Sequence, residues 1–296
     1  MNDRFDEMRL FVRIVEMRSF RRAAEALGIP ASTASDVVKR TEARLGVQLL
    51  SRTTRIVAPT LEGEAWYASC LRIVHDVEDA EAGFRQGEAE GRLRVDVHGT
   101  LARHFLLPRL PGFLDAYPGI ELIMSEGDRL VDLLREGVDC VVRVGTPVVS
   151  DLVVRRLGRL REITAASPDY LARHGTPSLL GDLDSHRMIG FLSSQTGRAM
   201  PLYFTVGGQE TEHLIRIALQ TSSAETMVAA AKQGIGIVQV PRYHVVDDLD
   251  AGRLVEILAD HEPSASPVSA LFPRGRQSSP RLRAFLDWVI RISFDT

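Results

Sequence analysis

The sequence predicts an α+α/β fold in three parts: a small helical domain, a long connecting helix and a two-lobed α/β domain. Within residues 1–60, apolar residues recur at helical spacing and are interrupted by glycine and proline, which predicts several short helices. Residues 61–90 are acidic and carry a seven-residue apolar repeat, which is typical of a long helix. Over residues 91–296, strand-like runs alternate with helical ones, and this alternation indicates a largely parallel sheet.

The first domain has the start and stop signals of a helix-turn-helix. A helix over residues 5–17 is followed by Ser19, a good N-cap for a second helix. Gly28 stands where a left-handed residue is favoured, and Pro30 prevents the second helix from continuing. The helix then predicted over residues 31–45 occupies the place in the motif that enters the DNA major groove. The apolar face of the first helix is predicted to consist of Met8, Phe11, Val12 and Val15.

Residues 51–60 predict a two-stranded wing, with Arg52 and Arg55 at its tip, where phosphate or the minor groove would be reached. A small helical core that binds no DNA is the alternative explanation of the helical pattern alone, and the basic wing argues against it. This winged helix-turn-helix is therefore expected to bind double-stranded DNA. Its candidate contact residues are Arg21, Ser32, Thr33, Ser35, Asp36, Lys39, Arg40, Arg52, Thr53 and Arg55.

The charge is divided in the same three parts. Residues 1–60 contain 11 Lys and Arg against 7 Asp and Glu, and residues 61–90 contain 2 against 8. The remaining 206 residues contain 23 against 24, so the formal net charge of −3 conceals a basic first domain. Because its excess of positive charge is modest, one copy is expected to bind DNA poorly, and a dimer is expected to be needed.

The connecting helix is predicted to form a dimer seam. Its apolar residues alternate in spacings of four and three, as in the a and d positions of a coiled coil. An amphipathic helix packed on its own domain would give the same periodicity, but the position between two domains favours the dimer. The seam residues are Trp66, Cys70, Ile73, Val77, Ala80 and Phe84.

The third domain is expected to divide into lobe I, about residues 91–165 and 268–296, and lobe II, about residues 166–267. Strands are predicted over residues 93–97, 120–124 and 139–144, with helices between them, which requires crossover connections. The last strand, Val268 to Phe272, is followed by enough chain to return to the first lobe.

Taken together, these motifs resemble the LysR-type transcriptional regulators, and the resemblance covers essentially the whole chain. It is carried by Phe20, Ala23, Ala24, Leu27, Gly28, Ser35, Glu42, Leu45, Gly46, Arg52, Thr53, Arg55, Thr60 and Gly63. It implies a linker helix that dimerises the DNA-binding domains, and a C-terminal domain like the type 2 periplasmic binding proteins, with two strands crossing between the lobes. It also implies a promoter-bound dimer or dimer of dimers and a small-molecule effector, often a carboxylate, in the cleft.

The chain departs from the family pattern at four positions: Arg18, Thr41, Leu50 and Asp36. Asp36 stands where the family is usually basic, in the helix that would enter the groove. An aspartate repels phosphate but can accept a hydrogen bond from cytosine N4. A local salt bridge with Lys39 or Arg40 is the interpretation that we favour.

Small ligands bind at strand ends and helix N-termini in such clefts, which gives a set of candidate effector contacts. His98 and Arg103 also follow the first strand, but neither is a strong candidate alone. Simple N-capping is an equally good explanation for Thr100, Ser222 and Ser223. The candidates are Thr100, Gly145, Thr146, Thr221, Ser222 and Ser223.

The sequence has no metalloprotease, serine-hydrolase, phosphate-loop or dinucleotide motif, and its histidines lack metal-ligand spacing. We expect no catalytic residue, no metal and no cofactor besides the effector. Two distant cysteines and the absence of a long apolar run favour a reducing cytoplasm, at the nucleoid, without membrane contact. RNA polymerase is a further expected partner. A small-molecule sensing module with incidental DNA affinity is the alternative function.

Overall fold

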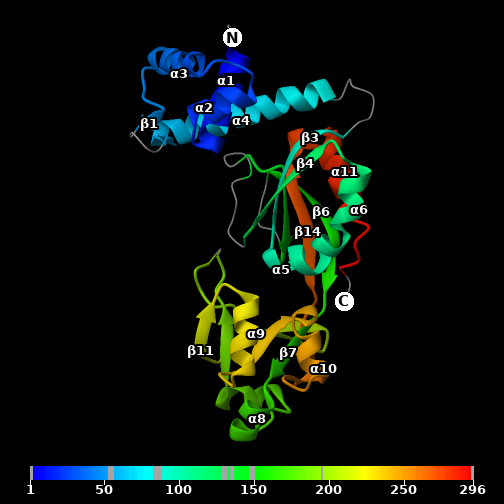
Figure 1. Cartoon of the computed structure of the whole chain (residues 1–296). Helices are drawn as coiled ribbons and strands as arrows, with labels where there is room; N and C mark the ends of the chain where they lie inside the picture. Colours follow the sequence, from blue (N-terminus) through cyan, green and yellow to red (C-terminus); the bar gives the residue numbers. More distant parts are fainter. Residues whose placement is uncertain are drawn as a thin grey trace.

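Three helices and a β-hairpin form the N-terminal head of the computed structural model, which describes residues 3–52, 57–82, 89–127, 133, 137–146, 151–194 and 196–294 (Figure 1). The elements of the head are α1 (Arg4–Met17), α2 (Phe20–Ala26), α3 (Ala31–Leu45), β1 (Leu50–Arg52) and β2 (Val57–Pro59). Ser19 caps α2, because its side chain accepts a hydrogen bond from the Arg22 amide at 3.3 Å. Gly28 and Gly46 have φ values of 65° and 73°, which favour glycine, so the predicted helix ends are confirmed.

The buried face of α1 is wider than its periodicity predicts. Phe11 and Val12 are buried as expected, whereas Met8 and Val15 are only half-buried. Leu10 and Ile14 are fully buried instead, in one core with α2 and α3. The reason is that α1 packs on two sides, since Val12 faces away from this core and contacts the connecting helix.

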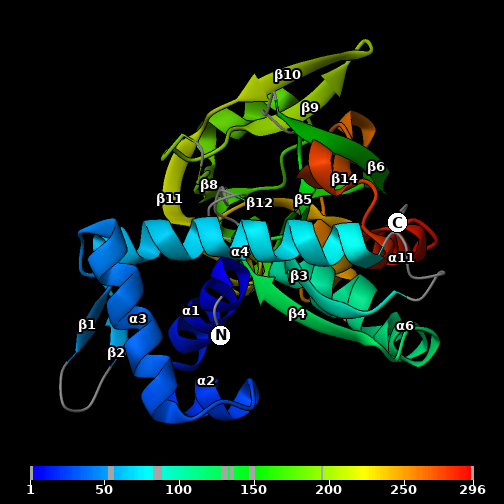
Figure 2. The same ribbon diagram turned by 90° about the horizontal axis from the view of Figure 1, so that it is seen from above.

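The connecting helix α4 (Leu61–Ala82) has 22 residues and lies across α1 and above the sheet of lobe I (Figures 1 and 2). The Thr60 hydroxyl accepts a hydrogen bond from the Gly63 amide at 3.0 Å and donates one to the Gln48 carbonyl at 2.6 Å. Thr60 therefore fixes the start of α4 against the base of the wing. None of the helices in the described segments combines the length and the apolar character that crossing a bilayer requires.

Lobe I is a five-stranded sheet of order β4-β3-β5-β14-β6. Its strands are β3 (Gly91–Val97), β4 (Ile120–Glu126), β5 (Cys140–Val144), β6 (Leu152–Leu160) and β14 (Ser266–Pro273). The pairs β3–β4 and β3–β5 are parallel, as expected, and β14 joins β5 and β6 in antiparallel pairing. The lobe also contains α5 (Gly99–Leu101), a π-helical turn (Ala102–Leu106), a 3-10 turn (Leu107–Arg109), α6 (Leu110–Ala116), a 3-10 turn (Arg274–Arg276) and α11 (Pro280–Val289).

Lobe II is less parallel than the alternation of its sequence indicates. Its strands are β7 (Glu162–Ala166), β8 (Arg187–Phe191), β9 (Leu202–Val206), β10 (Gln209–His213), β11 (Arg216–Thr221), β12 (Val238–Pro241) and β13 (Val255–Glu256). The β8–β11 pair is parallel, whereas β7 pairs antiparallel with both β12 and β13, and β9 and β10 form a hairpin. The helical elements are α8 (Pro168–His174), a 3-10 helix (Leu180–Ser185), α9 (Ala224–Lys232), a 3-10 turn (Arg242–His244), α10 (Val246–Asp250) and a 3-10 turn (Ala259–His261).

The boundary predicted between the lobes at residue 165 is wrong by one strand. β6 ends at Leu160 in the sheet of lobe I, and β7 begins at Glu162 in a sheet of lobe II. The chain returns to lobe I where β14 begins, at Ser266 rather than Val268. The two crossings therefore bring Glu162 and Ser266 together between the lobes, at the base of the cleft.

Candidate functional site

α3 lies at the edge of the head, next to the hairpin and away from the two lobes (Figures 1 and 2). Ser32, Asp36, Lys39 and Arg40 are exposed, and Thr33 and Ser35 are half-buried. Arg21 is also exposed and forms a long pair with Glu25 at 3.7 Å, one turn along α2. The structure thus places the described members of the predicted DNA-contacting set on or beside one accessible helix. Their contact with DNA remains a prediction.

The favoured salt bridge of Asp36 is not found. Among the described residues, no ion pair joins Asp36 to Lys39 or Arg40, although both lie within one turn of it. Pairs between exposed side chains gain little free energy, so no strong force holds this aspartate to its neighbours. The hypothesis that Asp36 accepts a hydrogen bond from a base remains open.

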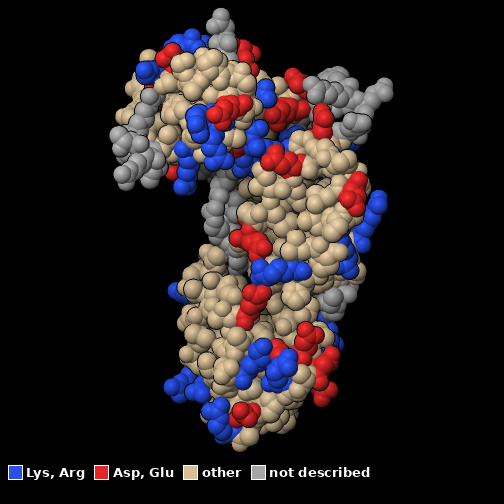
Figure 3. Space-filling view, in the orientation of Figure 1, with Lys and Arg blue, Asp and Glu red and all other residues tan. Residues whose placement is uncertain are grey.

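The two-stranded wing is present, because Leu50, Ser51 and Arg52 pair with Pro59, Ala58 and Val57. Arg52 ends β1, but its side chain, like Thr53 and Arg55, lies outside the described residues. On the face shown in Figure 3, basic side chains of the head are interspersed with acidic ones. This distribution agrees with the modest positive charge of the head.

Glu42 is a positioning residue that the sequence indicated only through family resemblance. Its Oε1 atom accepts hydrogen bonds from the amides of Leu49 and Leu50, at 2.9 and 3.1 Å. One carboxylate therefore fixes the end of α3 to the first strand of the wing. A glutamate one turn before a helix-ending glycine, with a strand close behind, is the local signal for this contact.

The predicted seam residues of α4 do not share one exposed face. Cys70 is fully buried against Val12 of α1, and Trp66 is half-buried in the same place. The alternative of a helix packed on its own domain is correct for this part of α4, because spacing alone does not identify the partner. Ile73 and Ala80 are exposed and Val77 is half-buried, whereas Phe84 lies outside the described residues.

Both cysteines are free and buried. Burial raises the pKa of Cys70 and that of Cys140 to about 12. Because the thiolate is the reactive form, neither side chain is suited to redox chemistry in this conformation.

A buried polar network, here called the linker contact, joins α4 to lobe I. Arg276 donates one hydrogen bond to Asp139 and another, at 3.1 Å, to Nδ1 of His75 on α4. Burial, followed by the nearby Arg276 charge, lowers the pKa of His75 to about 2, so its ring stays neutral and accepts this bond. Leu71, one turn earlier on α4, lies against Gly137, where an added Cβ would overlap its side chain.

A second contact joins α1 to the same lobe. Glu16 pairs with Arg92 of β3 at 2.7 Å and also with Arg94, and all three side chains are at most 25% exposed. The head, α4 and lobe I are therefore linked by ion pairs and hydrogen bonds within a single chain.

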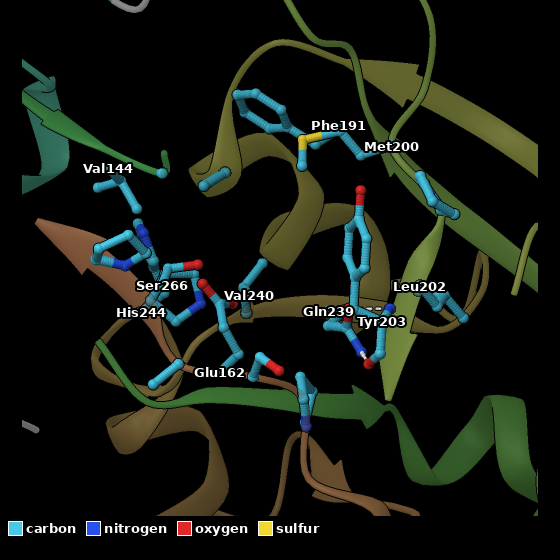
Figure 4. Close-up of a pocket in the computed structure, with 18 of the residues that line it drawn as sticks. Val144, Glu162, Phe191, Met200, Leu202, Tyr203, Gln239, Val240, His244 and Ser266 are labelled. Carbon is cyan, nitrogen blue, oxygen red and sulfur yellow. Dashed lines mark hydrogen bonds between the residues drawn. The ribbon is translucent and has the colours of Figure 1, made fainter. Parts of the chain in front are cut away.

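A cavity of about 710 Å³ lies between the two lobes, within the size range of small-molecule sites. Of the predicted effector residues, Gly145 and Thr146 line it. Thr100 lies one layer behind, where its hydroxyl is 2.8 Å from both His98 Nδ1 and the Tyr243 hydroxyl. Figure 4 shows Phe191 and Met200 on one side of the cavity and Val144 and His244 on another.

Thr221, Ser222 and Ser223 do not line the cavity, and the expectation that they do is wrong for this conformation. Ser223 caps α9, accepting a hydrogen bond from the Thr226 amide at 3.3 Å, and Thr221 accepts one from the Ser223 amide at 3.2 Å. The first turn of α9 also carries Glu225, which pairs with Arg103 of lobe I. N-capping, the alternative for Ser223, is therefore the observed role.

Sequence reasoning missed Glu162 and the residues around Gln239. The Gln239 amide accepts from the Tyr203 nitrogen at 2.8 Å and donates to the Tyr203 oxygen and Thr164 Oγ1, at 2.9 and 3.0 Å, which holds Tyr203 in the cavity wall (Figure 4). Burial raises the pKa of Glu162 to about 7, although a hydrogen bond with Ser266 opposes the shift. A lone glutamate before the apolar run of β7 was the available signal.

Two further groups beside the cavity are held neutral. Burial, helped by the charges of His104 and His98, lowers the pKa of His244 to about 3. Burial also raises the pKa of Tyr203, and the carboxylates of Glu212 and Glu210 add to this shift. Within the described segments, no three His, Cys, Asp or Glu side chains converge in a way that would hold a metal ion.

Arg103 bridges the lobes at the surface. It pairs with Glu126 of lobe I at 2.6 Å and with Glu225 of lobe II at 2.9 Å. Figure 3 shows a basic group between two acidic groups where the lobes meet. All three side chains are about half exposed, so this bridge is weaker than the linker contact.

Comparison with known proteins covers both ends of the chain. Residues 5–64 match the family described as bacterial regulatory helix-turn-helix protein, lysR family, and residues 86–292 match the LysR substrate binding domain. The uncharacterized HTH-type transcriptional regulator YhjC of Escherichia coli is 36% identical over 291 residues, 97% of each protein.

Solved structures show the same architecture. The structure of CrgA, a LysR-type transcriptional regulator from Neisseria meningitidis, is 32% identical, has a TM-score of 0.60 and matches over 98% of each chain. The full-length structure of the Vibrio cholerae virulence activator AphB is 26% identical, with a TM-score of 0.59 over 97% of this chain and 99% of that one.

Proposed function

This chain belongs to the LysR family of transcriptional regulators, with a DNA-binding helix-turn-helix and an effector-binding domain, and we propose how it works. A homodimer, or a dimer of dimers, binds a partly palindromic promoter site through α3 and the wing. A small molecule in the cavity between the lobes then changes the arrangement of the heads. The observation that carries the second step is a 710 Å³ cavity in a chain whose head is joined to lobe I by buried polar contacts.

The DNA step is supported by the exposed polar side of α3, which Glu42 fixes to the wing. The net charge of +4 in residues 1–60 supports dimeric binding, because two heads collect more phosphate contacts than one. Ile73, Val77 and Ala80 are the part of the predicted seam that the described portion of α4 leaves accessible to a second copy.

The ligand step requires a difference in affinity. A ligand changes DNA binding only if it binds two arrangements of the domains with different affinity. Ion pairs of Glu16 and the linker contact provide a path, because a shift of lobe I moves α1 and α4 with it. The protein is proposed to act in the cytoplasm at the nucleoid, with RNA polymerase as a further partner and without catalysis of its own or a cofactor beyond the effector.

The test is binding of the purified full-length protein to its own upstream intergenic DNA and to a scrambled duplex, across a salt series. A preference of about a thousandfold or more for the native site is expected, with affinity that falls steeply with salt. Absence of binding at low salt would contradict the DNA step and favour the sensing-module alternative.

Asp36→Asn tests whether Asp36 contributes to recognition of the DNA sequence. Removal of the negative charge is expected to raise affinity for the scrambled duplex, because the repulsion of phosphate is lost. If Asp36 also accepts a hydrogen bond from a base, the preference for the native site falls by about tenfold or more. Lys39→Ala is the control, and it is expected to weaken binding to both duplexes alike.

A further inference from the structure

The charged residues around the cavity differ in their exposure. Arg156, Arg159, Glu210 and Glu212 line it but are exposed to solvent, and their formal charges cancel. Glu162 is the one charged lining residue, among those described, that is not exposed. The interior of the cavity therefore contains a single carboxyl group, where the two crossing strands meet.

Two of the basic groups near Glu162 have other partners. Arg161 pairs with Glu262 and, at 3.4 Å, with Glu256, and Arg159 donates to the Ala265 carbonyl at 3.4 Å. The Ser266 hydroxyl contacts the Glu162 carboxyl group, which nevertheless retains lone pairs for another donor. Glu162 is thus placed to accept hydrogen bonds from a bound molecule.

The cavity offers little to an anion. His244 is neutral. The first turn of α9 reaches the cavity through Ala224, but its cap Ser223, whose hydroxyl accepts from the Thr226 amide, and Glu225 are not among the lining residues. Among the described lining residues, no arginine or lysine is shielded from solvent, so a bound carboxylate would be buried beside Glu162 without a buried cation. Burial of an unpaired charge is costly, and two close carboxylates repel one another.

The walls suit an apolar or aromatic body. Met188, Phe191, Leu202 and Val240 line the interior, Met200 lines the cavity from a more exposed position, and the Tyr203 ring stands beside them (Figure 4). Aromatic faces also attract cations, and thioethers adapt to the shape of a ring.

We infer that the cavity binds a small organic cation: an amine on an apolar or aromatic body, with the ammonium group on Glu162 and Ser266 and the body against Tyr203, Phe191 and Met200. This rests on the proposed function, because it assigns a chemical class to the effector of the same cavity. The inference runs against the carboxylate ligands that family resemblance implies.

Matched probes test the assignment by calorimetry on the full-length protein. The probes have a phenyl, indolyl or cyclohexyl ring on a two-carbon chain. Each ring is tested with a primary amine, a carboxylate and a neutral alcohol at the end of the chain. At least one amine is expected to bind about tenfold or more tightly than its carboxylate and alcohol counterparts. Tighter binding of the carboxylates, or no binding of any amine at millimolar concentration, overturns the inference.

Glu162→Gln tests whether the amine group binds at Glu162, since the substitution keeps the shape of the side chain and removes its charge. The preference for the amine is expected to disappear in this variant and to persist in the control Glu212→Gln, at the exposed mouth. An amine preference that survives Glu162→Gln overturns the role of Glu162. The comparison of probes on the unaltered protein needs no variant, so it decides the ligand class even if Glu162→Gln does not fold.

Promoter binding, measured with and without the bound probe, separates this inference from the proposed function. An amine that binds at Glu162 without changing DNA affinity contradicts the effector mechanism and leaves the ligand class standing. A carboxylate that binds and changes DNA affinity supports the effector mechanism and overturns the ligand class.

Discussion

The linker contact and the cleft between the lobes differ in how far their buried polar groups are hydrogen-bonded within the chain. At the linker contact, His75, Arg276 and Asp139 are at most 5% exposed and are hydrogen-bonded in a row. In the cleft between the lobes, Glu162 meets the Ser266 hydroxyl and otherwise faces a cavity of about 710 Å³. A complete network holds two elements in one arrangement, whereas an incomplete one leaves hydrogen-bonding capacity for a ligand. The linker contact is therefore suited to transmit a movement between lobe I and α4, and the cleft is suited to bind the ligand that causes the movement.

Removal of the Asp139 side chain should cause the largest loss of stability among the variants considered. Asp139→Ala leaves the Arg276 guanidinium buried without its carboxylate, and loss of one partner of a buried pair typically costs about 3–5 kcal/mol. Urea unfolding of the full-length protein measures the change. Asp287→Ala is the control, because its pair with Arg155 at 3.5 Å is exposed and should contribute less than about 1 kcal/mol. Equal losses for both variants would mean that the linker contact is no stronger than a surface pair.

A methyl group at Gly137 should weaken the same contact by overlap. Gly137→Ala places a Cβ on Leu71 of α4 and forces a φ of 65° on alanine, for an expected loss of about 2–4 kcal/mol. Gly252→Ala is the matched control, since its φ is 67° and it has open space around the added atom. The control should lose only about 1–2 kcal/mol in thermal or urea unfolding. A difference near zero would show that α4 moves aside freely.

Local signals in the sequence identify the elements of both contacts but not their partners. Ser19 and Gly28 act as expected because capping depends on neighbours within a few residues, and the Thr60 cap of α4 is equally local. The return of β14 to lobe I agrees with what the family resemblance implies, since the sequence itself shows only that the last segment is long enough to return. By contrast, Cys70 has the spacing of a dimer seam and is buried against α1, because periodicity defines a face and not what covers it.

The cavity shows the same limit. Gly145 and Thr146 line it, as expected for residues at a strand end, whereas Ser223 caps α9 and lies outside the lining. Glu162 was missed because its place depends on which sheet β7 joins, and that is decided by pairing with β12 far along the chain. Site residues can be predicted from the sequence where a single strand end or helix end positions them. They cannot be predicted where their position depends on how the two lobes pack together.

Acid should affect the two contacts in opposite directions. The pKa of His75 is about 2 in the folded protein and near 6.5 when unfolded, so acidification from pH 7 to 5 protonates the unfolded chain first and removes about 2 kcal/mol of stability. The pKa of Glu162 is about 7 when folded and near 4.5 when unfolded, so the folded protein gains its proton first and stability rises by about 2 kcal/mol.

Two variants separate these contributions in urea unfolding at pH 7 and pH 5. His75→Gln should make the protein relatively more stable at pH 5 than the unaltered chain is, and Glu162→Gln should make it relatively less stable. If both variants changed the difference in stability between pH 7 and pH 5 in the same direction, the proposed contrast between the linker contact and the cleft would be contradicted.

The smallest effect is expected at Arg103, the bridge across the mouth of the cleft. Arg103→Met breaks pairs with Glu126 and Glu225, but all three side chains are about half exposed, so stability should fall by less than about 1 kcal/mol. Urea unfolding beside Asp139→Ala checks this directly. A loss as large as that of Asp139→Ala would mean that the lobes are held together as firmly as α4 is held to lobe I. A cleft held so firmly could not open for a ligand without losing that stability, so a small value for Arg103→Met is what an effector site at this position requires.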